Sequence, residues 1–258
     1  MEIRRAKLLY ALHHLRLATV SALNKMTGTR TQTISAWLKE LEAEGWIHSL
    51  GYANTDPATG LAGQWWHPSR KNVKGVVWKD AFQANVKVLT EGQAEKTRTI
   101  QFGKSYIKRH ELEASVIIAT ASQCMRECKL PGKLESETYL RQVRKWCGNP
   151  RNAEQHAATY LVSVPDARIS AGAWSLSIEC ESTVKGVESY RRYVEHAEAG
   201  AHVLWIVRHD RAADHLLALL DDAGNGAAKG HTVAVQDLAY EAIKACITAA
   251  SAERSALS

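Results

Sequence analysis

Val203-Leu204-Trp205-Ile206-Val207 is a continuous run of five apolar residues. Such a run is typical of a short strand that is buried on both faces of a sheet. On its C-terminal side, helical periodicity over 210–222 is followed by a second strand pattern at 232–235 and a last helix at 237–252. The run therefore predicts the core of a sheet whose strands alternate with helices.

The same alternation continues on the N-terminal side of the run. Residues 185–199 have helical periodicity, and 160–164 and 174–178 have strand patterns, with the turn-like pair Ala171-Gly172 between them. A long helix is expected over 106–129, stopped by Pro131-Gly132. The fold class is thus expected to range from α+β to α/β, with a mixed-sheet α/β domain over 103–258.

The first seventy residues have a different pattern. Three helices are expected over 3–16, over 19–27 with Thr19 as its cap, and from Thr29 or Thr31 to Gly45. Strand-like runs follow at 46–50 and 64–68, joined by a polar loop. Three helices and a hairpin are the order of a winged helix, predicted here over 1–70, and the lysine-rich residues 71–102 are predicted to be a basic connector.

In a winged helix the third helix enters the major groove of DNA. Its first turns here offer hydroxyl groups, an amide and two cationic side chains, which suit contacts with phosphates and base edges. The candidate DNA-binding residues are Arg30, Thr31, Gln32, Thr33, Ser35 and Lys39. The alternative is that these residues only cap and solvate a helix of a three-helix bundle.

Bulk composition agrees with binding to a polyanion. The 258-residue chain carries a formal net charge of +6 and has a pI near 9.0. Its five cysteines include no Cys-x-x-Cys pair, so a thiolate zinc site is not expected. The sequence has neither a signal-peptide pattern nor an apolar stretch long enough for a membrane span, and we expect a cytoplasmic protein with no membrane partner.

Acidic residues gather at the ends of the two strands expected before the apolar run. Asp166 follows Pro165, and Glu179 and Glu181 lie two apart, so they point to one face of a strand. Neighbouring carboxylates repel each other unless they share a cation or a proton. Lys185 lies four residues after Glu181, close enough for its ammonium to reach the same cluster.

These side chains predict a hard-oxygen site for Mg²⁺ or Mn²⁺, with Asp166, Glu179 and Glu181 as metal ligands. A cation there would bind a phosphate and activate a nucleophile, and Lys185 would stabilise the charge developing on phosphorus. The alternative is a turn at Asp166 and a solvated edge strand carrying both glutamates.

The spacing of Pro165-Asp166 and Glu179 resembles that of the PD-(D/E)xK nuclease superfamily. Glu181 stands where those nucleases place their usual lysine, and Lys185 would be a displaced substitute. With Arg109-His110-Glu111-Leu112 and Tyr190-Arg-Arg-Tyr193 included, the pattern is similar to the replication-relaxation proteins and the MobC-type plasmid mobilisation relaxases. The resemblance covers roughly residues 100–222.

The resemblance implies a restriction-endonuclease-like domain and a role in plasmid mobilisation during conjugation. Such a relaxase binds double-stranded DNA at a transfer origin and nicks one strand, with other relaxosome proteins and a coupling protein as possible partners. The catalytic set would be Asp166, Glu179, Glu181 and Lys185. The possible accessory residues are Glu135 or Glu137 as a helix acid, His110 as a supporting group, and Tyr190 and Tyr193 as nucleophiles or as packing residues.

Two other functions fit the same residues. The first is a non-catalytic winged-helix accessory factor or regulator whose nuclease-like domain is degenerate, which the missing lysine at position 181 favours. The second is a restriction-type or repair nuclease, which would cut both strands or act at lesions.

Overall fold

The computed structural model describes residues 3–53, 63–68, 109–137, 139–140, 164–172, 174–181, 183–190, 201–223 and 230–257. Contacts between residues divide the chain into two units, Met1–Gln123 and Cys124–Ser258, which are described separately. The predicted basic connector 71–102 and the loop 54–62 lie outside the described residues.

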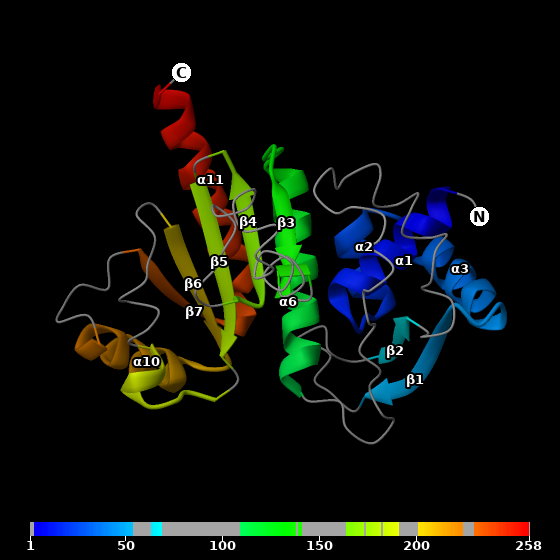
Figure 1. The fold of residues 1–258 in the computed structure, drawn as a ribbon, viewed down its shortest axis with the longest axis horizontal. Helices are drawn as coiled ribbons and strands as arrows, with labels where there is room; N and C mark the ends of the chain where they lie inside the picture. Colours follow the sequence, from blue (N-terminus) through cyan, green and yellow to red (C-terminus); the bar gives the residue numbers. More distant parts are fainter. Residues whose placement is uncertain are drawn as a thin grey trace, which may run out of the picture. The chain divides into compact units, whose positions relative to one another are not determined.

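The N-terminal unit has the expected order of three helices and a hairpin. The elements are α1 (Ile3–Leu15), α2 (Val20–Thr27), α3 (Thr31–Ala43), β1 (Ile47–Ala53) and β2 (Gly63–Pro68) (Figure 1). β1 and β2 pair antiparallel, with His48 opposite His67. The five elements predicted from periodicity are therefore present within a few residues of the expected bounds.

Local chemistry sets the ends of these helices. The hydroxyl of Thr19 accepts a 3.1 Å hydrogen bond from the N–H of Ala22, so Thr19 caps α2 as predicted. Gly28 ends α2 with a φ of 70°, a conformation that glycine adopts without steric cost. The cap expected from Thr29 or Thr31 is wrong, because α3 starts after Arg30, whose side chain makes no capping hydrogen bond.

The helices of this unit share one apolar core, and the hairpin closes on it. The fully buried side chains include Leu12, Leu23, Ile34, Leu38 and Leu41. Ala18, between α1 and α2, exchanges two backbone hydrogen bonds of 3.0 Å with Trp66 of β2. The hairpin is thus tied to the segment that joins the first two helices.

The long helix expected over 106–129 is α6 (Arg109–Glu127). Its first part belongs to the N-terminal unit, where Leu112 and Val116 pack with Leu17 and Trp65. The hydroxyl of Ser115 donates to the carbonyl of Leu17, which fixes the helix against the same segment.

Within the described residues of the C-terminal unit, five strands form one mixed sheet in chain order. They are β3 (Lys133–Ser136), β4 (Ala167–Ala171), β5 (Trp174–Glu181), β6 (Ala201–Val207) and β7 (His231–Val235). β3, β4 and β5 are antiparallel, whereas β6 and β7 run parallel to β5. The apolar run that predicted a buried strand is confirmed, because Val203–Val207 lies between two strands and is at most 7% exposed.

The strand expected at 160–164 falls mostly outside the described residues. Val164 lies outside any strand, 160–163 lie outside the described residues, and the partner of β5 is β4, which begins only after Asp166. Pro165 has no N–H to donate to a ladder, whereas Ala167–Ala171 alternates buried and half-buried side chains with a period of two. Asp166 therefore immediately precedes β4.

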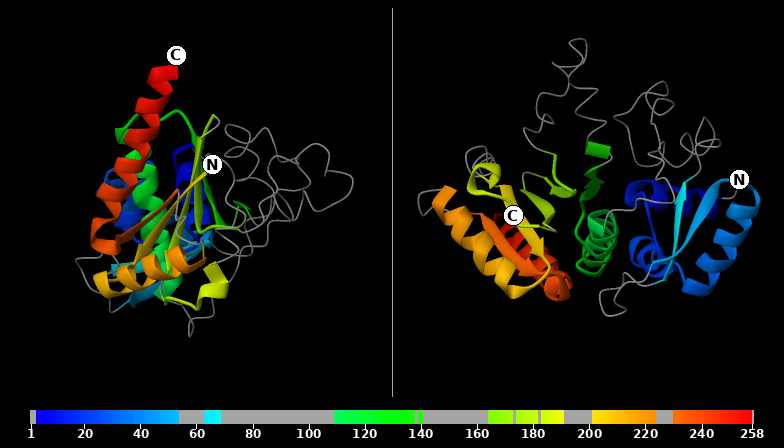
Figure 2. Two further views of the ribbon diagram at one scale, coloured as in Figure 1. Left: turned by 90° about the vertical axis from the view of Figure 1, so that its left-hand side faces the viewer. Right: turned by 90° about the horizontal axis from the view of Figure 1, so that it is seen from below.

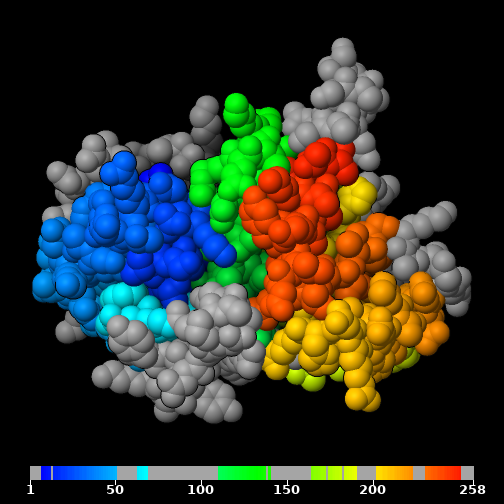
Figure 3. Space-filling model, turned by 180° about the vertical axis from the view of Figure 1, so that it is seen from behind, coloured from blue at the N-terminus to red at the C-terminus, as the bar shows by residue number. Residues whose placement is uncertain are grey.

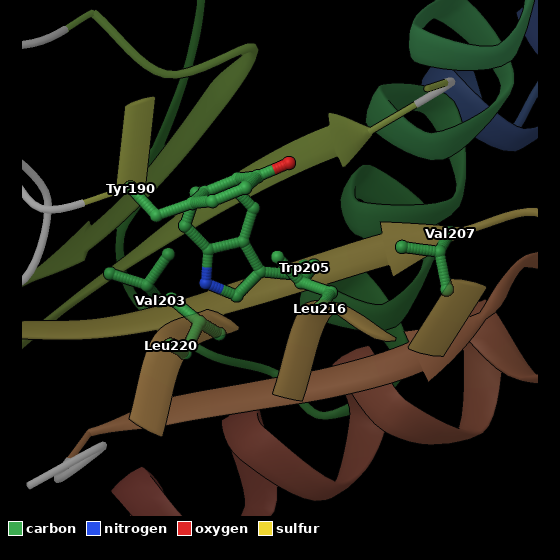
Figure 4. Packing of buried hydrophobic residues seen from close by; sticks show 6 residues of the cluster. All are labelled: Tyr190, Val203, Trp205, Val207, Leu216 and Leu220. Carbon is green, nitrogen blue, oxygen red and sulfur yellow. The ribbon is translucent and has the colours of Figure 1, made fainter. Parts of the chain in front are cut away.

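Helices cover the parallel strands. Leu216 and Leu220 of α10 (Asp210–Ala223) pack on Val203, Trp205 and Val207 (Figure 4). After the short turn η3 (Gln236–Leu238), α11 (Ala239–Leu257) runs along one side of the strands, behind the sheet in Figure 1 (Figure 2, left).

The last turn of α6 lies beside α11 (Figure 3). Cys124 donates to the carbonyl of Tyr240, and the hydroxyl of Tyr240 donates to Glu127. In the part of the chain that the structure describes, no helix combines the length and apolar character that crossing a bilayer requires.

Candidate active site

Three carboxylates lie near the C-terminal end of β5, and all three are largely buried. Asp166 is 8% exposed, and Glu179 and Glu181 are each 9% exposed. The Oδ2 atom of Asp166 accepts a 2.7 Å hydrogen bond from the backbone N–H of Cys180, the residue between the two glutamates. The carboxylate of Asp166 is thus fixed against the strand segment that carries both glutamates.

Strand register explains why these residues meet. Ala167 of β4 pairs with Ile178 of β5, so Asp166 comes opposite Glu179 at the end of the ladder. Glu179 and Glu181 are two residues apart on β5 and therefore point to the same face, which is also the face of Trp205 and Val207. The backbone positions of the three acids are therefore neighbours at this end of the sheet.

Lys185 contributes a positive charge to the same group. Its Nζ lies 3.2 Å from Oε2 of Glu181, and its side chain is 61% exposed. The i,i+4 spacing predicted that the ammonium would return to the acidic residues, and the structure places it there. The side chain is tethered at Glu181 but remains open to solvent.

The same face of the sheet is polar across the antiparallel strands and apolar across the parallel ones. Paired positions on this face carry charged and hydroxyl side chains, which we name the polar half-face. Its members on β3, β4 and β5 are Lys133, Glu135, Arg168, Ser170, Ser175, Ser177, Glu179 and Glu181. A polar surface therefore leads from β3 to the acidic residues.

Arg168 is a candidate that the sequence reasoning missed. It lies two residues after Asp166 and opposite Ser177, so its guanidinium starts from the same face as Glu179. The Nε atom of Arg168 is buried and has no hydrogen-bond partner among the described residues. The alternation of side chains over 167–171 is the signal in the sequence that could have found it.

Of the two candidates for the helix acid, Glu137 lies at a helical position, whereas Glu135 does not. Glu135 lies on strand β3, opposite Arg168, and accepts a 3.4 Å hydrogen bond from Ser170. Burial raises the pKa of Glu135, and Arg168 partly offsets that rise. The N–H of Glu137 donates to the carbonyl of Asp166 over 2.8 Å, so β3 also ends beside the acidic residues.

The remaining accessory residues lie in different surroundings. His110 is half-buried in the first turn of α6, in the N-terminal unit. Tyr190 is 1% exposed and packs against Trp205, which agrees with the packing role, whereas Tyr193 lies outside the described residues.

The predicted DNA-contacting residues begin at the N-terminus of α3. Arg30, Thr31, Gln32 and Lys39 are exposed, and Thr33 and Ser35 are half-buried. The hydroxyl of Ser35 donates back to the carbonyl of Thr31, so it is partly occupied within the helix. Ile34 and Leu38 of the same helix are fully buried, which orients the polar side chains away from the core.

The donor chemistry of the acidic residues fits a hard divalent cation, because carboxylate oxygens are the ligands that Mg²⁺ and Mn²⁺ prefer. Across the described ranges, no three His, Cys, Asp or Glu side chains are already arranged to hold a metal ion. Glu181 accepts hydrogen bonds from Lys185 and Tyr190. Binding of a cation by all three acids would therefore require a change of side-chain rotamer.

Comparison of the chain with protein-family models, curated proteins and solved structures gave no match.

Proposed function

We propose that this protein is a DNA-nicking endonuclease of the plasmid mobilisation relaxase type, which uses Mg²⁺ or Mn²⁺ to cleave one strand at a transfer origin. One observation carries the proposal: at the end of β5, the largely buried Asp166 is hydrogen-bonded to the backbone between the largely buried Glu179 and Glu181, and Lys185 is paired with Glu181. A stable sheet gains little from such a cluster unless it binds a cation, because like charges in a partly buried site repel one another.

Each residue has a role that follows from its position. Asp166, which immediately precedes β4, and Glu179 of β5 would hold the cation together with Glu181. The bound cation would supply Lewis-acid chemistry toward a phosphodiester. Lys185, whose side chain remains exposed, would stabilise negative charge on the phosphate oxygens.

Binding of the duplex is proposed for the N-terminal unit, acting as a winged helix. The order of three helices and a hairpin, with Ala18 bridged to Trp66, is the arrangement that such domains use. The exposed polar residues at the start of α3 would then face the major groove. The mixed sheet of the C-terminal unit is the coarse architecture that a restriction-endonuclease-like domain requires.

The test uses the full chain and a supercoiled plasmid. The plasmid carries the DNA that flanks the gene for this protein, as the candidate transfer origin. With Mn²⁺ we expect conversion of supercoiled to open-circular DNA, and we expect Asp166→Ala and Glu179→Gln to abolish it. Mn²⁺ binding to the protein alone, measured by electron paramagnetic resonance, gives a second readout. If the plasmid stays uncut and the protein binds no Mn²⁺, the proposed nicking activity is refuted.

A second candidate is a non-catalytic DNA-binding factor of the relaxosome. The observation that favours it is the hydrogen bonding of Glu181 to Lys185 and Tyr190, which occupies one of the proposed ligands. This function predicts tight DNA binding with no cleavage in any metal. A restriction-type nuclease would instead give linear DNA.

A further inference from the structure

The hydroxyl of Tyr190 contacts both residues of the Glu181–Lys185 ion pair. It accepts a 2.8 Å hydrogen bond from the backbone N–H of Lys185 and makes a hydrogen bond with the carboxylate of Glu181. Since an ionised carboxylate has no proton to donate, the tyrosine is the donor to Glu181. One side chain therefore contacts both members of the ion pair.

The ring of Tyr190 is held in the core that α10 forms on the sheet. It is 1% exposed and meets the ring of Trp205 edge-on, with centroids 5.5 Å apart at 82°. Leu216 and Leu220 belong to the same cluster (Figure 4). Burial raises the pKa of Tyr190 to about 12, and the negative charge of Glu181 adds to that rise.

These facts speak against the nucleophile role that the sequence left open for Tyr190. A nucleophile must reach the phosphate, whereas this hydroxyl is buried and has both a donor and an acceptor partner. The ring is instead a rigid support that extends from the core to the end of β5.

We infer that Tyr190 is a positioning residue, which holds the backbone of Lys185 and the carboxylate of Glu181 so that the ammonium stays beside the acidic residues. The inference rests on the proposed function for its catalytic meaning. Lys185 has a long, flexible side chain, so fixing the position of its backbone limits the volume that the ammonium can visit.

The test is Tyr190→Phe in the full chain, since this change removes the hydroxyl and keeps the ring that packs on Trp205. Tyr240→Phe is the matched control, because Tyr240 of α11 also donates to a glutamate, Glu127, but through an exposed hydrogen bond. The first readout is amide hydrogen exchange at Lys185 in the absence of DNA. We expect about tenfold faster exchange in Tyr190→Phe, the change that loss of one hydrogen bond produces, and none in the control.

The second readout is nicking of the supercoiled plasmid with Mn²⁺. For Tyr190→Phe we expect kcat to fall about tenfold with an unchanged KM. Unchanged exchange at Lys185 would overturn the inference, whether or not the protein cleaves DNA. Faster exchange in a protein whose wild type binds no Mn²⁺ and cuts no DNA would refute the proposed function but uphold the structural support of Lys185 by Tyr190.

Discussion

Asp166 and Cys180 are joined by a 2.7 Å hydrogen bond from the backbone N–H of the cysteine to the carboxylate of the aspartate. This bond continues the β4–β5 ladder through a side chain, at the point where β4 has not yet begun. Asp166 is therefore both a structural acceptor and a proposed metal ligand, and its two roles can be separated by mutation.

Asp166→Asn keeps an acceptor oxygen for Cys180 but removes the charge. We expect its free energy of unfolding to stay within about 1 kcal/mol of wild type, whereas Asp166→Ala should lose about 1.5–3 kcal/mol, the value of a hydrogen bond to a charged group. Both variants should fail to nick DNA. Urea unfolding measures the first difference, and equal stability of the two variants would show that the bond contributes little.

Lys185→Met should lower the rate of nicking by about 100- to 1000-fold, because the variant lacks the charge that would stabilise the transition state. Stability should change by less than about 1 kcal/mol, since the lysine side chain is 61% exposed in its pair with Glu181. Lys244→Met on α11 is the control for loss of an exposed lysine. A Lys185→Met protein with wild-type turnover would remove this residue from the catalytic set.

Arg30→Ala should weaken binding of duplex DNA by about 1–3 kcal/mol if Arg30 reads a base edge. Mn²⁺ binding should be unaffected, because the two sites lie in different units. Fluorescence anisotropy of a labelled duplex measures the affinity, with the exposed Arg211→Ala as the matched loss of one positive charge. Equal affinities of Arg30→Ala and wild type would contradict the groove assignment.

His14 should make the N-terminal unit sensitive to acid. Burial lowers the pKa of this fully buried ring from 6.5 to about 4. Between pH 6.5 and pH 4, His14 is protonated in the unfolded chain but neutral in the folded chain. Its contribution to the free energy of unfolding is therefore complete above pH 6.5, and roughly 3 kcal/mol is lost as the pH falls toward 4.

His14→Phe keeps an aromatic ring beside Tyr10, whose centroid is 4.4 Å from that of His14, and removes the titration. The free energy of unfolding, measured in urea at pH 7 and pH 4.5, should then depend less on pH than in wild type. The exposed His215→Phe should keep the wild-type slope. If the free energy of unfolding of His14→Phe depends on pH as strongly as that of wild type, other groups govern acid unfolding.

Gly132 allows β3 to start close to β4. A Cβ at this position would lie 2.6 Å from the carbonyl oxygen of Ser170, so backbone must shift in Gly132→Ala. We expect a loss of roughly 1–3 kcal/mol in urea unfolding. Gly186→Ala, where a Cβ would meet nothing within 4 Å, should be nearly neutral, and comparable losses in both variants would show that the close approach to Ser170 is not the cause.

Periodicity was enough to predict most of the elements. Val203–Val207 has no polar residue and is buried on both faces, and the apolar spacing on α3, with Ile34 and Leu38, determines which side of that helix is exposed. The hydroxyl of Thr19 and the absence of a side chain on Gly28 determine the limits of α2. These signals act over a few residues, so the sequence alone carries them.

The partners across the sheet could not be predicted in the same way. The register of β4 against β5 places Asp166 beside Cys180, and the register of β3 brings Glu135 to Arg168. Strand pairing is a contact between distant segments, and a shift of one residue turns every side chain to the other face. The contact of Tyr190 could not be predicted either. The packing of its ring on Trp205 determines that its hydroxyl accepts a hydrogen bond from the backbone N–H of Lys185. The chain by itself thus determined which residues carry charge and where helices and strands occur, whereas the tertiary structure decided which charges meet, because that depends on long-range register and packing.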